Sequence, residues 1–465
     1  MRPHAVPRRY LLAAAVAAAA CVLTSTAASA AVRRRPVVNP PTFAVFEAPS
    51  PLGDRNAAGE PSIGVDWRTG AVLYQANLQT FRVDFAGADP ATSAAWSVVT
   101  PTQTAFNIDP ILATDPASGL TFAGGDDGAC SVLGVTDDDG ANWQTSVPCT
   151  GTPDHPTVGV GPVASASLPV PGQHGRAVYF CQQYPLEDEC TASLDDGTSW
   201  FPAAPVTGGC IGPSGHVKVS ADGTAYLPIR ACSVNNNALS LDGSEVGGAV
   251  STDTGRSWTS YFIANAAWPV RGFDPSVATT PDNTVYESWA GYGSYHPLVA
   301  WSHDRGRSWS HPVDLAGTVQ PPIAASTFQA AVGGDNGRVA IAFLGSAVQP
   351  TGTQTPFDPA YAGIWYLYVS FTYDGGVTWT TVRADPHPVQ LGTICDKGSQ
   401  CLNGRNLLDF MDATVDAHGR VLVGFAEGCR GGCPDGTNGS PQSQDSWAAV
   451  ARQESGPPLF FRPRD

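Results

Sequence analysis

One eight-residue pattern, repeated five times, constrains the fold of this 465-residue chain more than any other feature of its sequence. Each copy has Ser or Thr first, Asp third, Gly fifth, a small polar residue seventh and Trp eighth. The copies are TDDDGANW (136–143), SLDDGTSW (193–200), STDTGRSW (251–258), SHDRGRSW (302–309) and TYDGGVTW (372–379). Their starts lie roughly 50 to 70 residues apart, a spacing typical of an array of similar structural units.

The composition of these octets predicts a tight turn between two strands. The Asp carboxylate can accept hydrogen bonds from backbone N–H groups of its own turn, and the Gly can adopt a positive φ. The Trp that follows can bury a large ring against neighbouring strands. We therefore expect the octets to stabilise the fold rather than to take part in chemistry.

The octets resemble the Asp box, or BNR repeat, of the sialidase superfamily. This resemblance implies a β-propeller in which each box lies in an outer hairpin, away from the active site. It covers the scaffold, most of residues 42–453, and carries over no catalytic residue, because the chain lacks the Phe/Tyr-Arg-Ile-Pro motif of catalytic sialidases. Glu60 stands where their arginine is expected, so the resemblance does not imply a true sialidase.

A second repeated element precedes the octets and consists of two runs of alternating small and apolar residues around a tight turn. Seven such hairpins occur, at 61–75, 110–125, 155–183, 217–229, 275–289, 330–345 and 412–428. A hairpin and the octet hairpin after it supply four strands, the content of one propeller blade. We therefore predict an all-β fold, a single β-propeller of seven four-stranded blades closed by an N-terminal strand at 42–49. A ring of six blades is the alternative.

The two ends of the chain lie outside this pattern. Residues 1–30 have the basic start, apolar stretch and small-residue cleavage site of a secretory signal, and Arg8-Arg9 also suits twin-arginine export. We expect residues 31–41 to form a flexible lead, 42–456 the propeller and 457–465 a tail. No later apolar run approaches the ~20 residues of a membrane helix, so we expect a secreted protein.

Charge and cysteine content bear on the partners. The formal net charge of −16 repels phosphate backbones and anionic lipid, which argues against nucleic acid and membranes. An even number of cysteines follows the signal, and in an exported chain this favours disulfides over metal. Proximity predicts the bridges Cys130–Cys149, Cys181–Cys190, Cys210–Cys232, Cys395–Cys401 and Cys429–Cys433. We expect a monomer whose partner is an extracellular glycan or glycoconjugate.

The first strand of each propeller blade lines the central channel, so the residues that start these strands should converge. The strand-start residues are Glu60, Asp109, His155, His216, Asp274 and Gln329, with Asp409 or Asp412 in the last blade. An acidic residue follows six positions after four of them, at Asp66, Asp115, Asp222 and Asp335. On this comparison we treat the strand-start residues as equivalent and predict a ring of ionisable groups at one mouth of the channel.

Such a ring suits acid–base chemistry. Crowded carboxylates cannot all ionise easily, so the pKa of at least one rises and creates an acid beside a base. Glycoside hydrolysis uses such a pair, and we assign Glu60, Asp109 and Asp274 as candidate catalytic residues. The candidate binding residues are His155, His216, Gln329, Arg405, Asp409 and Asp412. The sequence requires no cofactor, and the acidic mouth would suit a divalent metal.

Three classes of function remain open from the sequence, and whether the chain is an enzyme remains open with them. The first class is a glycan-active hydrolase that uses the mouth carboxylates, and we place it ahead because the resemblance points to glycosides. The second is a non-catalytic propeller that binds a glycan or a protein. The third is a polysaccharide lyase with His155 or His216 as its base. The fold does not decide among them.

Overall fold

The computed structural model describes residues 39–50, 52, 57–87, 90–102, 109–126, 130–149, 154–164, 169–183, 188–207, 209–232, 245–263, 274–401, 404–429 and 445–464. All of them belong to one unit, Asn39–Asp465. The predicted signal at 1–30 lies outside the described residues, as does most of the predicted lead. Within the described ranges, no helix has the length and apolar character to cross a membrane.

Antiparallel sheets make up nearly all of the regular structure. Two sheets comprise β2 (Ser62–Val65), β3 (Val72–Ala76), β4 (Gln79–Ala86) and β5 (Ser93–Val98), and β6 (Pro110–Thr114), β7 (Thr121–Asp126), β8 (Ser131–Thr136) and β9 (Gln144–Ser146). A nine-stranded sheet contains β10 (Asp154–Gly161), β11 (Ala177–Gln183), β12 (Asp188–Ser193), β13 (Ala204–Thr207), β14 (Cys210–Ser214), β15 (Lys218–Val219), β16 (Ala225–Cys232), β17 (Glu245–Ser251) and β18 (Trp258–Phe262). Its two halves, β10–β13 and β14–β18, are joined by a short parallel pairing of β13 with β18.

Three further sheets follow along the chain. They comprise β19 (Ser276–Thr279), β20 (Val285–Ala290), β21 (Pro297–Ser302) and β22 (Val313–Asp314); β23 (Ala325–Gly333), β24 (Val339–Ser346), β25 (Ile364–Thr372), β26 (Thr380–Arg383) and β27 (Gln390–Leu391); and β28 (Asp412–Val415), β29 (Val421–Glu427), β30 (Trp447–Ser455) and β1 (Thr42–Glu47). The described helical structure is limited to two 3-10 turns, η1 (Ala316–Thr318) and η2 (Gly398–Gln400). The predicted all-β class is therefore confirmed.

The N-terminal strand pairs with the C-terminal end of the chain. β1 runs antiparallel to β30, with Phe46 opposite Val450, and so becomes the outer strand of the last sheet. The backbone N–H of Ala48 extends the pairing by donating to the carbonyl of Ala448. This is the partnership that the lone strand at 42–49 predicts.

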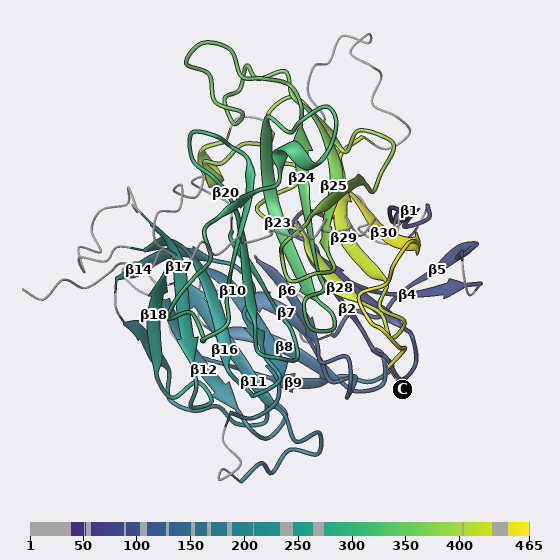
Figure 1. Cartoon of the computed structure of the whole chain (residues 1–465). Helices are drawn as coiled ribbons and strands as arrows, with labels where there is room; N and C mark the ends of the chain where they lie inside the picture. Colours follow the sequence, from purple (N-terminus) through teal and green to yellow (C-terminus); the bar gives the residue numbers. More distant parts are fainter. Residues whose placement is uncertain are drawn as a thin grey trace, which may run out of the picture. The chain divides into compact units, whose positions relative to one another are not determined.

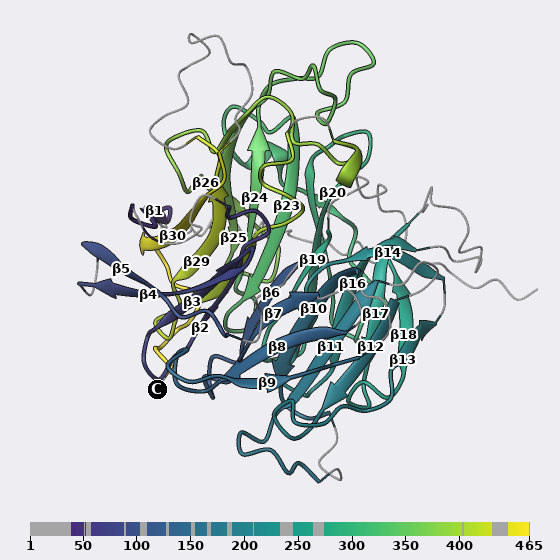
Figure 2. The same cartoon turned by 180° about the vertical axis from the view of Figure 1, so that it is seen from behind.

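The first strands of the sheets pack against one another in a closed cycle. β2 contacts β6, and the contacts continue through β10, β15, β19, β23 and β28, which in turn contacts β2. In both views β2, β6, β10 and β23 lie in the interior, while β5 and β18 lie at the outside (Figures 1 and 2). The close approach explains the small residues of the first strands, because a Cβ on Gly64 would lie 2.2 Å from Thr114 and one on Gly333 would lie 1.9 Å from the carbonyl oxygen of Thr279.

The hydrophobic core lies between neighbouring sheets. Phe122 of β7 and Phe180 of β11, for example, are fully buried in one cluster that spans two sheets. The C-terminal segment joins this core, since Leu459 and Phe460 are buried and the ring of Phe460 meets that of Trp67 edge-on at 5.3 Å. The segment 457–464 therefore packs on the body of the unit.

Each octet forms the turn between two paired antiparallel strands or their ends, which are β8 and β9, β12 and β13, β17 and β18, β21 and β22, and β25 and β26. The octet that begins at Ser302 is typical: the Ser302 hydroxyl donates to Asp304 and accepts from the N–H of Gly306, and Asp304 accepts from the N–H and hydroxyl of Ser308. Residues four and five of every octet have positive φ, here 62° at Arg305 and 79° at Gly306. The turn is thus built from its own hydrogen bonds, as the composition predicts.

The predicted disulfides are confirmed wherever the structure describes both cysteines. The bridges are Cys130–Cys149, Cys181–Cys190, Cys210–Cys232 and Cys395–Cys401. Cys429 is disulfide-bonded as well, and its predicted partner Cys433 lies outside the described residues. Several structural disulfides are typical of proteins that fold in an oxidising compartment.

Candidate functional site

The register of the sheets places Glu60, Asp109 and Asp274 at the same depth. Each precedes by five residues the last paired residue of its first strand, which is Val65, Thr114 or Thr279. His155 precedes Gly161 by six residues, and a bulge between Asp154 and Thr157 absorbs the extra one. These four residues therefore start their strands at one mouth of the cycle of first strands.

The predicted equivalence does not hold for His216, Gln329 and Asp412. His216 and Asp412 precede the last paired residues of their strands, Val219 and Val415, by three positions, and Gln329 precedes Gly333 by four. For His216 and Gln329 the reason is that the turn after the strand closes earlier, at Ser220 and Gly334, than the acids used for the comparison suggest. The turn after Asp412 closes at Asp416, four positions later. At about 3.3 Å per residue, His216 and Asp412 lie roughly 7 Å deeper in the channel.

We call Glu60, Asp109, His155, Asp274, Arg405 and Asp409 the mouth cluster, because hydrogen bonds, ion pairs and electrostatic interactions connect them. Glu60 is 3 % exposed, and its backbone is held at a φ of 56° while its N–H donates to the carbonyl of Leu407. His155 has the same φ of 56°. A positive φ is costly for residues with a Cβ, and such strain concentrates at functional sites.

The surroundings of Glu60 favour the neutral form of its carboxyl. Burial raises the pKa of Glu60 well above its usual range, and the neighbouring carboxylates of Asp409 and Asp109 raise it further. Its Oε2 is buried and has no hydrogen-bond partner among the described residues. A neutral carboxyl of this kind can donate a proton.

His155 connects two of the predicted carboxylates. Its backbone N–H donates to Asp109 Oδ2 at 3.1 Å, and its Nε2 lies 2.6 Å from Asp274 Oδ2. Burial lowers the pKa of His155, but Asp274, with smaller contributions from Asp409 and Glu60, outweighs burial, and the pKa rises to about 10. His155 is therefore an imidazolium cation at neutral pH. Burial raises the pKa of Asp109, and the N–H of His155 offsets part of that rise.

The loop before β28 adds a second cation. Arg405 forms an ion pair with Asp409 and interacts electrostatically with Glu60 and Asp109. The mouth cluster thus holds both cations and carboxyls, with proton-donating and anion-stabilising groups next to one another. Phe410, the residue after Asp409, places its ring edge-on to His155 at 6.0 Å and to His216 at 4.7 Å, so it lies between the mouth and the deeper layer.

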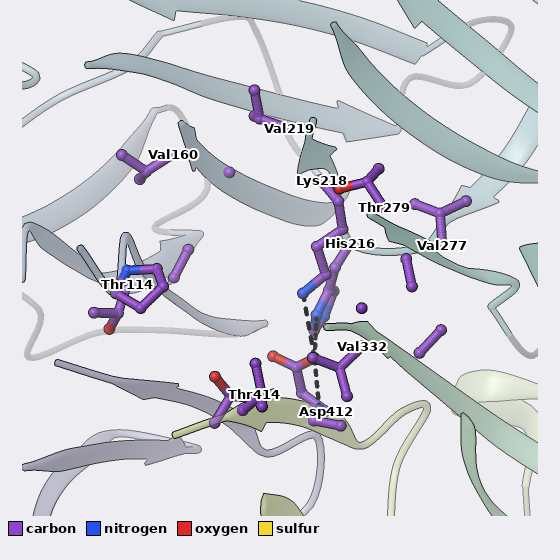
Figure 3. Close-up of a pocket in the computed structure, with 18 of the residues that line it drawn as sticks. Thr114, Val160, His216, Lys218, Val219, Val277, Thr279, Val332, Asp412 and Thr414 are labelled. Carbon is purple, nitrogen blue, oxygen red and sulfur yellow. Dashed lines mark hydrogen bonds and ion pairs between the residues drawn. The ribbon is translucent and has the colours of Figure 1, made fainter. Parts of the chain in front are cut away.

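The deeper layer, which contains His216 and Asp412, lines a cavity of about 300 Å³ inside the cycle of first strands (Figure 3). His216 and Lys218 lie across from Asp412, whose Oδ1 is 3.4 Å from His216 Nδ1 and 3.5 Å from Lys218 Nζ. Burial alone would raise the pKa of Asp412, but Lys218 and His216 lower it to about 2. Apolar side chains form most of the remaining wall, among them Val160, Val219, Val277 and Val332.

No protein-family model and no curated protein matches the chain. Solved structures do resemble it. A protein of unknown function from Dyadobacter fermentans is 14 % identical with a TM-score of 0.43, over 90 % of this chain and 100 % of that one. The Aleuria aurantia lectin AAL, in complex with Fucα1-6GlcNAc, is 13 % identical with a TM-score of 0.43, over 76 % and 100 % of the chains. The NanB sialidase from Streptococcus pneumoniae is 11 % identical with a TM-score of 0.42, over 89 % and 71 %.

The three structures share only 11 to 14 % of their residues with this chain. They transfer no residue and no activity to this chain. At TM-scores below 0.5, the residues of the chain itself have to carry any functional conclusion.

Two of the structural results concern residues that sequence reasoning misplaced or missed. Gln329 is buried and turns to its own strand, where its Nε2 donates to Ser326 Oγ at 3.2 Å.

Asp188 of β12 was not predicted, yet it is fully buried and interacts electrostatically with His155 and Asp274. Burial raises its pKa well above the usual range, and neither carboxyl oxygen has a hydrogen-bond partner in the described part of the chain. The sequence marks Asp188 only as an acidic residue in a strand that is buried, two positions before the disulfide cysteine Cys190.

The acidic mouth predicts a site that would suit a divalent metal. Among the residues that the structure describes, no three His, Cys, Asp or Glu side chains gather in a way that could hold a metal ion. The acid–base groups of the mouth cluster are instead engaged with one another and with two cations.

Proposed function

We propose that this chain is an exported, glycan-active hydrolase on a seven-bladed β-propeller, with the mouth cluster as its active site. The closed cycle of β2, β6, β10, β15, β19, β23 and β28 supports seven blades over six. The hydrogen-bonded octet turns support their role as Asp boxes between the outer strands. The four disulfides support export.

The observation that carries the proposal is the placement of Glu60 and Asp109 at the same depth at one mouth of the cycle of first strands. The two carboxyls interact electrostatically, and burial raises the pKa of each. Glu60, the more strongly shifted, acts as the general acid that protonates the leaving oxygen. Asp109, half-buried and held by the N–H of His155, acts as the general base toward water. A glycosidase needs such a pair of carboxyl groups with different protonation states.

Asp274 takes an electrostatic role in this proposal. It keeps His155 cationic, and the cation next to Asp109 favours the ionised form of that carboxylate. A cationic His155 has no free lone pair with which to accept a proton at neutral pH. The pairing of His155 with Asp274 therefore favours a hydrolase over a lyase that would use His155 as its base.

A panel of defined polysaccharides and oligosaccharides, assayed for new reducing ends, tests the proposal. The expected result is turnover with a bell-shaped pH profile, since Asp109 must be ionised and Glu60 protonated. Binding without turnover, across pH and with divalent cations added, would show a non-catalytic glycan binder instead. A product that absorbs in the ultraviolet, as an unsaturated sugar does, would show a lyase.

A further inference from the structure

A second feature lies at the mouth end of the sheets, on the loop between β20 and β21. Asp274 precedes β19 at the mouth, β19 runs away from it, and β20 returns, so the loop 291–296 lies at the mouth end. Tyr292 on this loop is 53 % exposed. Among the described residues, only Phe461 is another large aromatic side chain with comparable exposure.

The loop holds its tyrosines rigidly. The Tyr295 N–H donates to the Gly291 carbonyl at 2.6 Å, the Gly291 N–H donates to the His296 carbonyl at 3.0 Å, and Tyr295 has a φ of 59°. The rings of Tyr292 and Tyr295 lie edge to face, with centroids 6.4 Å apart. The loop therefore presents two aromatic rings in a fixed arrangement.

The ring of Tyr295 packs against a series of buried aromatic rings. Tyr295 meets Phe357 edge-on at 5.9 Å, and Phe357 stacks on Trp365 at 6.4 Å. Tyr361 meets Trp365 edge-on at 5.9 Å, and the Trp365 Nε1 donates to the Gly392 carbonyl at 2.8 Å. Phe357, Tyr361 and Trp365 are buried, so the column anchors the loop in the core. A surface fixed in this way loses little conformational freedom when a ligand binds.

Hydrogen bonds connect this loop to the first strand of the next sheet, and carboxylates lie beside it. The Ser326 N–H donates to the Tyr295 carbonyl at 2.7 Å, and Ser326 accepts from Gln329. Asp358 and Asp396 both interact electrostatically with Tyr295. We call Tyr292, Tyr295, Asp358 and Asp396 the tyrosine patch.

We propose that the tyrosine patch is a subsite for a neutral pyranose unit of a glycan that extends from the mouth cluster. A pyranose ring presents a C–H face that can pack on an aromatic ring and hydroxyl groups that donate to carboxylates. The two acids, on a chain with a net charge of −16, repel an acidic sugar, which is why the unit is neutral. This inference rests on the proposed function and adds the substrate class.

The test measures binding of neutral pyranose oligosaccharides of increasing length by isothermal titration calorimetry. Tyr292→Ala should weaken long oligosaccharides about tenfold, near the upper end of what one aromatic contact contributes, and leave short ones unchanged. Tyr292→Phe should bind as the parent does, because the ring and not the hydroxyl packs on the sugar. The matched control is Phe461→Ala, which removes a ring that is 68 % exposed at the opposite end of the sheets and should change nothing.

The outcomes separate the two proposals. If long oligosaccharides bind and Tyr292→Ala binds them as well as the parent, the subsite is overturned while a glycan-active mouth stands. If acidic oligosaccharides bind at the patch more tightly than neutral ones, the assigned substrate class is overturned. If no oligosaccharide of any length binds, the proposed function fails and the subsite fails with it.

Discussion

The carboxylates of the octet turns and those of the mouth lie at opposite ends of the same sheets, and their pKa values shift in opposite directions. Burial favours the neutral form of the octet residues Asp138, Asp195 and Asp253, but hydrogen bonds from their own turns outweigh it and lower the pKa of each. At the mouth, burial raises the pKa of Glu60 and Asp109, and the charge of nearby carboxylates adds to the rise.

The surroundings of a carboxylate, and not its recurrence in the repeat, therefore decide its role. Asp304 accepts hydrogen bonds of 2.6 to 2.8 Å from both groups of Ser308, so its charge is stabilised within one turn. Glu60 has other acids as neighbours and a buried oxygen without a described partner. A satisfied carboxylate stabilises a turn, whereas an unsatisfied one keeps a proton that can be used in chemistry.

The largest effect should come from Glu60→Gln. The amide keeps the shape of the neutral carboxyl and cannot donate the proton, so turnover on any hydrolysed glycan should fall about 10²–10⁴-fold. Thermal unfolding should show no loss of stability, because the change removes an ionisable group from a buried position. Asp304→Asn is the control and should turn over normally. Full activity in Glu60→Gln would remove Glu60 from the acid role.

Asp274→Asn should lower the pKa of His155. Without the Asp274 carboxylate, only the smaller contributions of Asp409 and Glu60 oppose burial, so the pKa of His155 should fall from about 10 toward its ordinary 6.5. Titration of the imidazole signals by NMR measures the fall, with Asp304→Asn as the unshifted control. Since the folded pKa is raised, the stability due to this pair is complete below pH 6.5 and is lost as pH rises through about 10. An unchanged titration would show that another group sets the charge of His155.

Asp304→Ala should lower stability and spare activity. It removes the acceptor for the hydroxyl of Ser302 and for two donors of Ser308, which should cost about 1–3 kcal/mol in the free energy of unfolding. Denaturant unfolding measures the cost, and turnover per folded molecule should stay at the parental value. A loss of turnover at unchanged stability would place the octet in the active site. The carboxylates of the octets and those of the mouth would then no longer differ in role.

The smallest effect is the pH dependence of that turn. Hydrogen bonds from Ser308 lower the pKa of Asp304 to about 2 from an ordinary 3.8. The stability that Asp304 contributes is therefore complete above pH 3.8 and is lost as pH falls through about 2. The difference in unfolding free energy between the parent and Asp304→Asn should shrink over that interval in a series of acid unfolding curves. A difference that stays constant would mean that the charge of Asp304 is not what its turn uses.

The sequence by itself determined the features that depend on neighbours along the chain. Each octet contains both the donors and the acceptor of its turn, so its geometry could be predicted from eight residues. The four described disulfides join cysteines no more than 22 positions apart. The strand at 42–49 could be recognised because it had no partner nearby and the last hairpin lacked an outer strand.

The tertiary structure decided which residues meet at the mouth and how they ionise. A bulge adds one residue to β10 without a mark in the sequence, and an early turn moves His216 and Asp412 to a deeper layer than Glu60. Asp188 interacts with His155 because β12 belongs to the same sheet as β10, with β11 paired between them. The pKa of a buried group depends on every charge around it, and in a closed cycle of strands those charges come from residues that are hundreds of positions apart.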